Sequence, residues 1–239
     1  MTTAFIIPCA INNFRDTDDA IEKVLHSIQS IRAISPKANI ALIDYALNPL
    51  SAEQKTPLLE EVSLLAEYQQ NPRIKDIEEK FDAHKAEAVS LVAALAWFFG
   101  LCQRDKLFQQ TTRIVLLSAG ASLDENTFKS IDSNDSGKYI FSPPENSPLE
   151  SRLTGGVGML FNTTIWSFSA EQLDSLMEAL WKSLDYTFDR IKHNGYSDLG
   201  HALYKHIDSS EIFYIKNLCD QAFEAPIASS PSPTRTLHS

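Results

Sequence analysis

The order of apolar segments along the chain predicts an α/β fold, a single domain with a mostly parallel central sheet flanked by helices. Residues 5–10 form a short apolar run of strand length, followed by turn-forming asparagines. Residues 17–34 place isoleucine and leucine side chains at helical spacing on one face, and residues 38–45 form a second apolar run. A strand, a helix and a strand in this order predict a right-handed parallel unit, from which such sheets are built.

End signals define the other elements. The first helix begins at Thr17, where acidic residues fill the first turn, and ends before Pro36. Thr56 and Pro57 predict the start of a second helix, because threonine caps helices and proline suits the first helical position. Residues 84–101 are apolar nearly all round, which is typical of a helix buried under a sheet.

The elements of the second half are less regular. The polar stretch 74–82 is expected to be a surface excursion. The remaining predicted elements are a third strand at 113–117, a strand at 138–142, a glycine-rich turn into a strand at 154–161, a helix from Ser169 with a capping box to Gln172, a short helix at 198–206 and a last strand at 211–216.

Composition bounds the class of protein. The 239 residues are 44% hydrophobic and 22% charged, which excludes a mainly disordered or fibrous chain. We expect one domain over residues 1–224 and a disordered tail at 225–239, because the tail has no apolar period. The formal net charge of -10 makes the molecule repel polyanions, so nucleic acid is not expected as a partner. The oligomeric state cannot be read from the sequence.

Cysteine usage and the apolar segments predict a cytoplasmic protein without a transmembrane segment. Cys9, Cys102 and Cys219 lie far apart and show no zinc or redox spacing, so we expect buried, reduced thiols. The first residues lack the positive region of a signal peptide. The longest apolar run, 86–101, is shorter than the ~20 residues of a membrane span and is expected to be a core helix.

Polar residues follow the predicted strands where ligands bind in open parallel sheets. The carboxyl ends of the three strands offer residues 8–13, Asp44 and residues 118–124. Pro8, Asn12, Asp44 and Ser118 are therefore candidates for a binding site. The alternative is structural, with the asparagines turning the chain and Asp44 capping a loop. Neither a phosphate-binding P-loop nor a dinucleotide glycine fingerprint is present in the sequence.

Four segments carry a resemblance to a known family. They read FIIPCAINNFRD, SIQSIRAISPKANIALIDYA, HKAEAVSLVAAL and RIVLLSAGASLDENTF. In their order these segments resemble the nucleotide-binding half of GT-A type glycosyltransferases and their bacterial and viral relatives. The resemblance covers roughly residues 3–130 and, more loosely, GYSDLGHALYKHI near the end. It implies a nucleotide-binding half at 1–130 and an acceptor half at 131–224.

The resemblance implies transfer of a sugar from a nucleotide-sugar donor to a glycan or another hydroxyl acceptor. In that fold the loop after the first strand cups the nucleotide, and the acidic residue after the second strand, here Asp44, lies near the base. Lys85, with Glu87, stands at the helix that follows, and the third strand leads to a metal-binding Asp-x-Asp loop. This chain has SAGAS in that place, so Asp124 is a weak candidate metal ligand. A Mn or Mg cofactor is left open.

Two cations are candidates for meeting the phosphate charge of a donor. Lys85 could reach a diphosphate from the start of its helix, and Arg152 precedes a glycine-rich turn whose amides could help to bind an anion. The alternative for both is a solvated surface side chain. Gly155, Gly156 and Gly158 could line an acceptor site or simply make a hairpin.

Asp198 and His201 are the candidate catalytic pair. At spacing i and i+3 they share one helix face, so the carboxylate could take a proton from an acceptor hydroxyl while the histidine orients it or binds metal. The alternative is an ordinary exposed helix turn. Two rival functions remain from the sequence: a non-catalytic nucleotide-, sugar- or partner-binding module of the same fold, and an α/β domain unrelated to sugar transfer.

Overall fold

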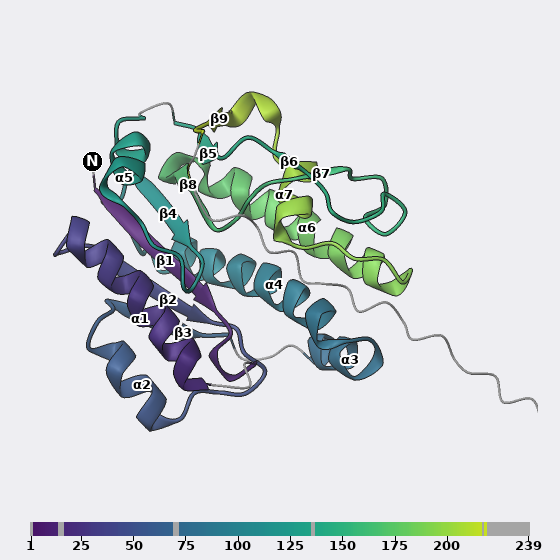
Figure 1. Ribbon diagram of the computed structural model, residues 1–239, viewed down its shortest axis with the longest axis horizontal. Coiled ribbons are helices and arrows are strands. Elements are labelled where there is room, and N and C mark those ends of the chain that lie inside the picture. The colour runs from purple at the N-terminus through teal and green to yellow at the C-terminus, as the bar shows by residue number, and fades with distance from the viewer. Residues whose placement is uncertain (1, 14–16, 69–71, 135–136, 217, 219–239) are drawn as a thin grey trace, which may run out of the picture.

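The computed structural model describes residues 2–13, 17–68, 72–134, 137–216 and 218 (Figure 1). In these residues one sheet of seven strands has the order β3-β2-β1-β4-β8-β5-β9. The strands of this sheet are β1 (Thr3–Cys9), β2 (Asn39–Asp44), β3 (Leu64–Glu67), β4 (Arg113–Leu117), β5 (Tyr139–Phe141), β8 (Ile165–Ser169) and β9 (Ile212–Tyr214). The fold is α/β with a mostly parallel sheet, as predicted.

One strand of the sheet runs against the others. β1 pairs in parallel with both β2 and β4, β3 pairs in parallel with β2, and β9 pairs in parallel with β5. β8 lies between β4 and β5 and is antiparallel to both. The register of the first pair brings Cys9 opposite Asp44, so the ends of β1 and β2 lie together at one edge.

Helices cover both faces of the sheet (Figure 1). The elements on one face are α1 (Thr17–Ile34), α2 (Ala52–Leu59) and α5 (Glu125–Asp132), and those on the other are α4 (Ala83–Arg104), α6 (Leu173–Lys192) and α7 (Leu199–His206). Alternate strand residues point to opposite faces. Phe5 and Ile7 therefore pack with α1, while Ile6 packs with α4.

The sequence predicts most of these elements, and the strand at 113–117 and the helix end before Pro36 are confirmed. Three local predictions are wrong. α2 begins after Ser51, whose capping box with Gln54 satisfies two backbone donors, and Pro57 lies inside the helix rather than at its start. Residues 72–80 form the helix α3 (Pro72–Lys80). Ser169 makes no side-chain cap, and the Gln172 amide donates to the Gly137 carbonyl at 3.1 Å.

A short hairpin stands beside the main sheet. β6 (Glu145–Asn146) and β7 (Met159–Leu160) pair as antiparallel strands in a separate two-stranded sheet. The predicted strand at 154–161 is therefore only two residues long. Gly155 and Gly156 lie in the loop that joins these strands, both with positive φ (61° and 93°), where a residue with a side chain would be strained.

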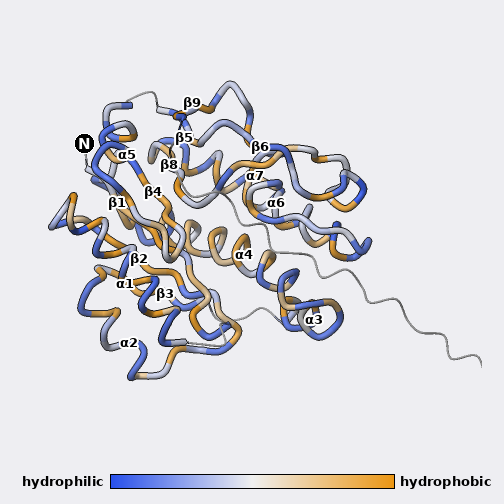
Figure 2. Tube along the Cα trace, viewed as in Figure 1, coloured by the Kyte–Doolittle hydropathy of each residue, from blue (hydrophilic) through white to orange (hydrophobic). Residues whose placement is uncertain are grey.

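The helix α4 is long and apolar enough to cross a membrane by length and composition, the one such helix among the described residues. Its most apolar window, with mean hydropathy 1.5, is 67% buried inside the protein. Apolar residues continue along α4 and the central strands in Figure 2. This burial against the sheet and α6 is what a core helix needs, as predicted.

Two of the three cysteines have the predicted state. Cys9 and Cys102 are free and buried. Cys219 and the predicted tail at 225–239 lie outside the described residues.

Candidate functional site

Asp44 is a buried carboxylate at the end of β2. Its side chain is 2% exposed, and its Oδ1 accepts a hydrogen bond from the Ile11 N–H at 3.0 Å. Burial raises its pKa from 3.8 to about 6, opposed by backbone hydrogen bonds from Ile11 and Ala46. Asp44, a candidate from the sequence, is thus an acidic group held where the ends of β1 and β2 lie together.

A cavity of about 210 Å³ opens beside Asp44. Its other lining residues are Ala46, Leu47, Pro49, Glu67, Tyr68 and Lys75. Glu67 ends β3 and is engaged on both oxygens, accepting from the Leu50 N–H at 3.0 Å and pairing with Lys55 at 2.6 Å. The cavity is therefore lined by two carboxylates, an aromatic ring and a lysine.

Asn12 fastens the loop after β1 to the loop after β2. Its Nδ2 donates to the Pro49 carbonyl at 2.8 Å, and its Oδ1 accepts from the Gln54 amide at 2.9 Å. Pro8, half-buried, lies within β1 opposite Ile43. These contacts give Asn12 the structural role left open by the sequence, at the rim of the cavity.

A second acidic group lies between α4 and the segment before α7. Burial raises the pKa of Glu87, and its charge in turn raises the pKa of Tyr45 and of Tyr196, both of which are raised mainly by burial. The charge of Asp198 also raises the pKa of Tyr196. Glu87 therefore acts on Tyr45, which follows Asp44, and on Tyr196, which precedes Asp198 by two residues. Asp44 and Asp198 thus border the same region.

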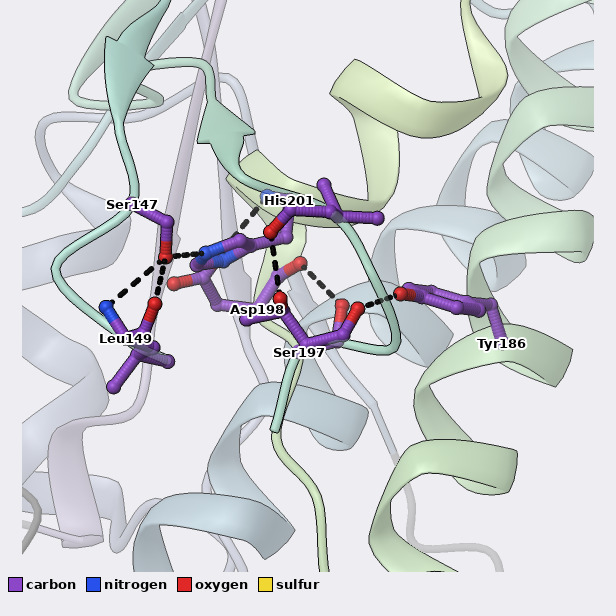
Figure 3. Close-up of polar contacts among 8 residues, drawn as sticks. Ser147, Leu149, Tyr186, Ser197, Asp198 and His201 are labelled. Carbon is purple, nitrogen blue, oxygen red and sulfur yellow. Dashed lines mark hydrogen bonds and ion pairs between the residues drawn. The ribbon is translucent and has the colours of Figure 1, made fainter. Parts of the chain in front are cut away.

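Ser147, His201 and Asp198 form a continuous hydrogen-bonded chain (Figure 3). The His201 Nε2 lies 2.8 Å from the Ser147 Oγ, and its Nδ1 lies 2.8 Å from the Asp198 Oδ1. Asp198 is also the N-cap of α7, accepting from the His201 N–H at 3.0 Å. His201 is 1% exposed, so its ring is fixed inside the protein.

The tight packing of α7 makes this arrangement rigid. A Cβ at Gly200 would overlap the Phe161 carbonyl oxygen, and the Phe161 N–H donates to the Gly200 carbonyl at 3.2 Å. Glycine is therefore required between Asp198 and His201 for the helix to approach this backbone. The structure brings these two side chains into contact, with His201 buried and Asp198 half-buried, so they are not an ordinary exposed helix turn.

The two predicted cations are paired with neighbouring carboxylates. Lys85 lies 3.3 Å from Asp82, with a side chain 21% exposed at the start of α4. Arg152 is 77% exposed and pairs with Glu150 at 2.5 Å. Such pairs are weak, so either cation can exchange its carboxylate for a phosphate at small cost.

Ser118 and Asp124 both serve the loop after β4. The Ser118 hydroxyl donates to the Thr163 carbonyl at 3.3 Å. Asp124 caps α5: its Oδ1 accepts from the Asn126 and Thr127 N–H groups, and its Oδ2 accepts from the Thr127 hydroxyl at 2.6 Å. These bonds, the Thr127 hydroxyl first, lower the Asp124 pKa.

The described residues do not fit a divalent metal site. Both Asp124 oxygens are used in capping, and no group of three histidine, cysteine, aspartate or glutamate side chains among the described residues could hold a metal ion. A hard cation such as Mg²⁺ needs several oxygen ligands. The sequence SAGAS supplies none in its side chains except serine hydroxyls.

Sequence reasoning missed three residues of the region. Tyr45 directly follows Asp44, and Tyr196 stands two residues before Asp198, so both could have been found as neighbours of candidates. Ser147 is 54 residues from His201 in the chain, and no local pattern announces their contact.

No family model matches this chain, and no curated protein matches it. Solved structures do. The galactosyltransferase LgtC, in complex with donor and acceptor sugar analogues, is similar over 88% of this chain and 72% of its own, with 9% identity and a TM-score of 0.53. An active-site mutant of LgtC gives the same coverage with 8% identity and a TM-score of 0.55. Mouse xyloside xylosyltransferase 1 covers 89% of this chain and 84% of its own, with 11% identity and a TM-score of 0.49.

At identities of this order the likeness concerns the fold. The prediction drawn from residues 3–130 is confirmed at that level, and the likeness extends well beyond them. The chain has the GT-A-like fold of the galactosyltransferase LgtC.

Proposed function

We propose that this protein is a glycosyltransferase that moves a sugar from a nucleotide-sugar donor to a hydroxyl group, such as that of a glycan. The observation that supports this most is the acidic region at the carboxyl edge of a GT-A-like sheet. It joins Asp44 at the end of β2, Glu87 in α4 and the Asp198–His201 pair at the start of α7. Open parallel sheets bind ligands at this edge.

The donor nucleotide binds over the ends of β1 and β2 in this proposal. Carboxylates accept hydrogen bonds, so Asp44 suits the N–H groups of a base or the hydroxyls of a ribose. Pro8, Asn12 and Ser118 frame the surrounding loops. Lys85 and Arg152 meet the diphosphate after leaving Asp82 and Glu150.

The acceptor binds on the α7 side, where Asp198 is the proposed base. Its Oδ1 is held by the His201 backbone and ring, while its Oδ2 has no hydrogen bond among the described residues. That oxygen is able to take the proton of an acceptor hydroxyl as the hydroxyl oxygen attacks the sugar. His201 holds the carboxylate in place, and no step is assigned to a metal.

A non-catalytic binding module of the same fold is the second candidate. It is favoured by the sequence SAGAS after β4 and by the capping role of Asp124, since the described residues do not gather carboxylates for a metal. In either case we propose a cytoplasmic protein, supported by the free, buried thiols of Cys9 and Cys102.

Calorimetric titration tests the donor site. Uridine, guanosine, cytidine and thymidine diphosphates and their common sugars are titrated into the protein, and at least one is expected to bind. Absence of heat and of thermal shift at millimolar ligand, a limit of roughly 4 kcal/mol of binding energy, would contradict the donor site. Asp44→Asn is expected to weaken binding, while Asp185→Asn, an exposed carboxylate on α6, serves as the matched control.

Release of nucleoside diphosphate separates the two candidates. An enzyme releases it from the bound sugar nucleotide when a panel of glycan acceptors is added. Tight binding with no release on any acceptor would favour the binding module.

A further inference from the structure

In the hydrogen-bonded chain of Ser147, His201 and Asp198, the imidazole lies between a serine hydroxyl and a carboxylate (Figure 3). The proposed sugar transfer does not use the serine. Asp198 contacts the Nδ1 of the ring, and Ser147 contacts the Nε2, both at 2.8 Å. A carboxylate only accepts hydrogen bonds, so Nδ1 carries the hydrogen. In the neutral ring Nε2 is then an acceptor aimed at the serine hydroxyl.

The hydroxyl hydrogen of Ser147 has one good acceptor. Its other contact as a donor is the Leu149 carbonyl at 3.5 Å, which is far longer than the 2.8 Å to Nε2. The Leu149 N–H donates to the Ser147 Oγ at 3.1 Å, so it does not compete for that hydrogen. The serine proton is therefore placed on the line to the imidazole, as a nucleophile and its base require.

The chain joins a buried histidine to two half-buried side chains. His201 is 1% exposed, and the Asp198 side chain is 19% exposed. Ser147 is half-buried in the β6–β7 loop. The Ser147 N–H is bonded to the Gly158 carbonyl at 2.9 Å, which fixes the serine backbone in the loop.

We propose that Ser147 is a nucleophile for acyl transfer, with His201 as its base and Asp198 as the positioning residue, and that the protein hydrolyses carboxylic esters. The same arrangement of roles recurs on unrelated folds, so it is recognised by geometry rather than by position in the sequence. This activity needs no nucleotide sugar, but it uses the same Asp198 and His201 side chains as the proposed glycosyl transfer.

The reaction proceeds in two balanced steps. Ser147 Oγ bonds to the ester carbonyl carbon as its proton passes to His201 Nε2; the bond to the alcohol oxygen then breaks, and His201 returns the proton to that oxygen. Water next attacks the acyl-serine carbonyl and gives its proton to Nε2. The bond between the acyl carbon and Ser147 Oγ then breaks, His201 Nε2 returns the proton to Oγ, and the carboxylic acid leaves. The Leu149 N–H, 3.1 Å from Oγ, lies beside the reacting oxygen throughout.

Covalent labelling of the full-length protein is the decisive test. A fluorophosphonate reacts with activated serines and leaves an adduct that peptide mass spectrometry locates. We expect the adduct on Ser147, with labelling reduced at least ~100-fold in Asp198→Asn, since a positioned base is worth ~10² to 10⁴ in rate. Ser151→Ala, an exposed serine in the same loop, is the matched control and is expected to label normally.

Hydrolysis of p-nitrophenyl acetate provides the second readout. Ser147→Ala is expected to reduce the protein-dependent rate at least ~100-fold, and Ser151→Ala to leave it unchanged. Thermal melts establish that each variant is folded; if Ser147→Ala is not, the adduct on the unmodified protein decides. An adduct elsewhere, no adduct at all, or hydrolysis that persists in folded Ser147→Ala would overturn the proposal. Binding of a nucleoside diphosphate that survives Ser147→Ala would leave the donor site standing in every one of these cases.

Discussion

Replacing Asp44 by asparagine should stabilise the protein at neutral pH and remove a pH dependence of its stability. The side chain is 2% exposed, and burial is the largest cause of its raised pKa, so the ionised form is costly in the folded state. Asparagine keeps the size and the acceptor for the Ile11 N–H but carries no charge. The ionised Asp44 carboxylate lowers the stability of the fold, and its place at the proposed nucleotide site fits a functional role.

The magnitude follows from the shift of the pKa from 3.8 to about 6. Between these values the folded state holds a proton that the unfolded chain has released, so stability falls as pH rises. The contribution is fully present below pH 3.8 and is lost as pH rises through about 6. The total is about 3 kcal/mol, of which about 2 kcal/mol falls between about pH 4.5 and about pH 8. The Ala46 N–H also donates to the Asp44 carboxylate, and loss of that bond in the variant would offset about 1 kcal/mol of the gain.

Urea unfolding at a series of pH values measures this effect. We expect the free energy of unfolding of Asp44→Asn, relative to the unmodified protein, to increase by about 2 kcal/mol from about pH 4.5 to about pH 8. Asp185→Asn removes the same charge from an exposed position on α6 and is the control for net charge. A stability difference that is independent of pH, or one that decreases as pH rises, would refute the reasoning.

Three further predictions address the site. Asp198→Asn should hold donor affinity while turnover falls by ~10² to 10⁴-fold, and single-turnover rates near normal would remove Asp198 from the mechanism. Because Asp124 is committed to capping α5, nucleotide affinity measured with and without a chelator should differ by less than ~10-fold, or ~1.4 kcal/mol. A greater loss of affinity in the chelator would reveal metal ligands elsewhere in the protein. Gly200→Ala should cost ~1 to 3 kcal/mol in unfolding free energy, because its Cβ meets the Phe161 carbonyl, and unchanged denaturant curves would contradict this close packing.

The central strands and the buried helix are readable from the sequence because their cause is local. The side chains of 114–117 are apolar on both faces, and α4 is apolar nearly all round, as burial on two sides demands. The ends of helices were predicted less accurately than these elements. The Ser51–Gln54 capping box moved the start of α2 ahead of the threonine and proline, because two satisfied donors outweigh a preferred proline position.

The strand order depended on tertiary pairing. β8 joins the sheet antiparallel between β4 and β5, and β3 adds to the edge through only four residues. Short strands take their place from partners distant in the chain, so their own sequence gives little signal.

By itself, the sequence determined the α/β class, the shared edge of Asp44 with the loop after β1, and the common helix face of Asp198 and His201, because periodicity and parallel pairing place residues over short distances. Only the tertiary structure decided which of these polar groups are buried and with whom they pair. It joined Ser147 to His201 across 54 residues and directed Asp124 into a helix cap. Those outcomes depend on desolvation and on hydrogen-bond partners from other elements, neither of which is encoded in a local pattern.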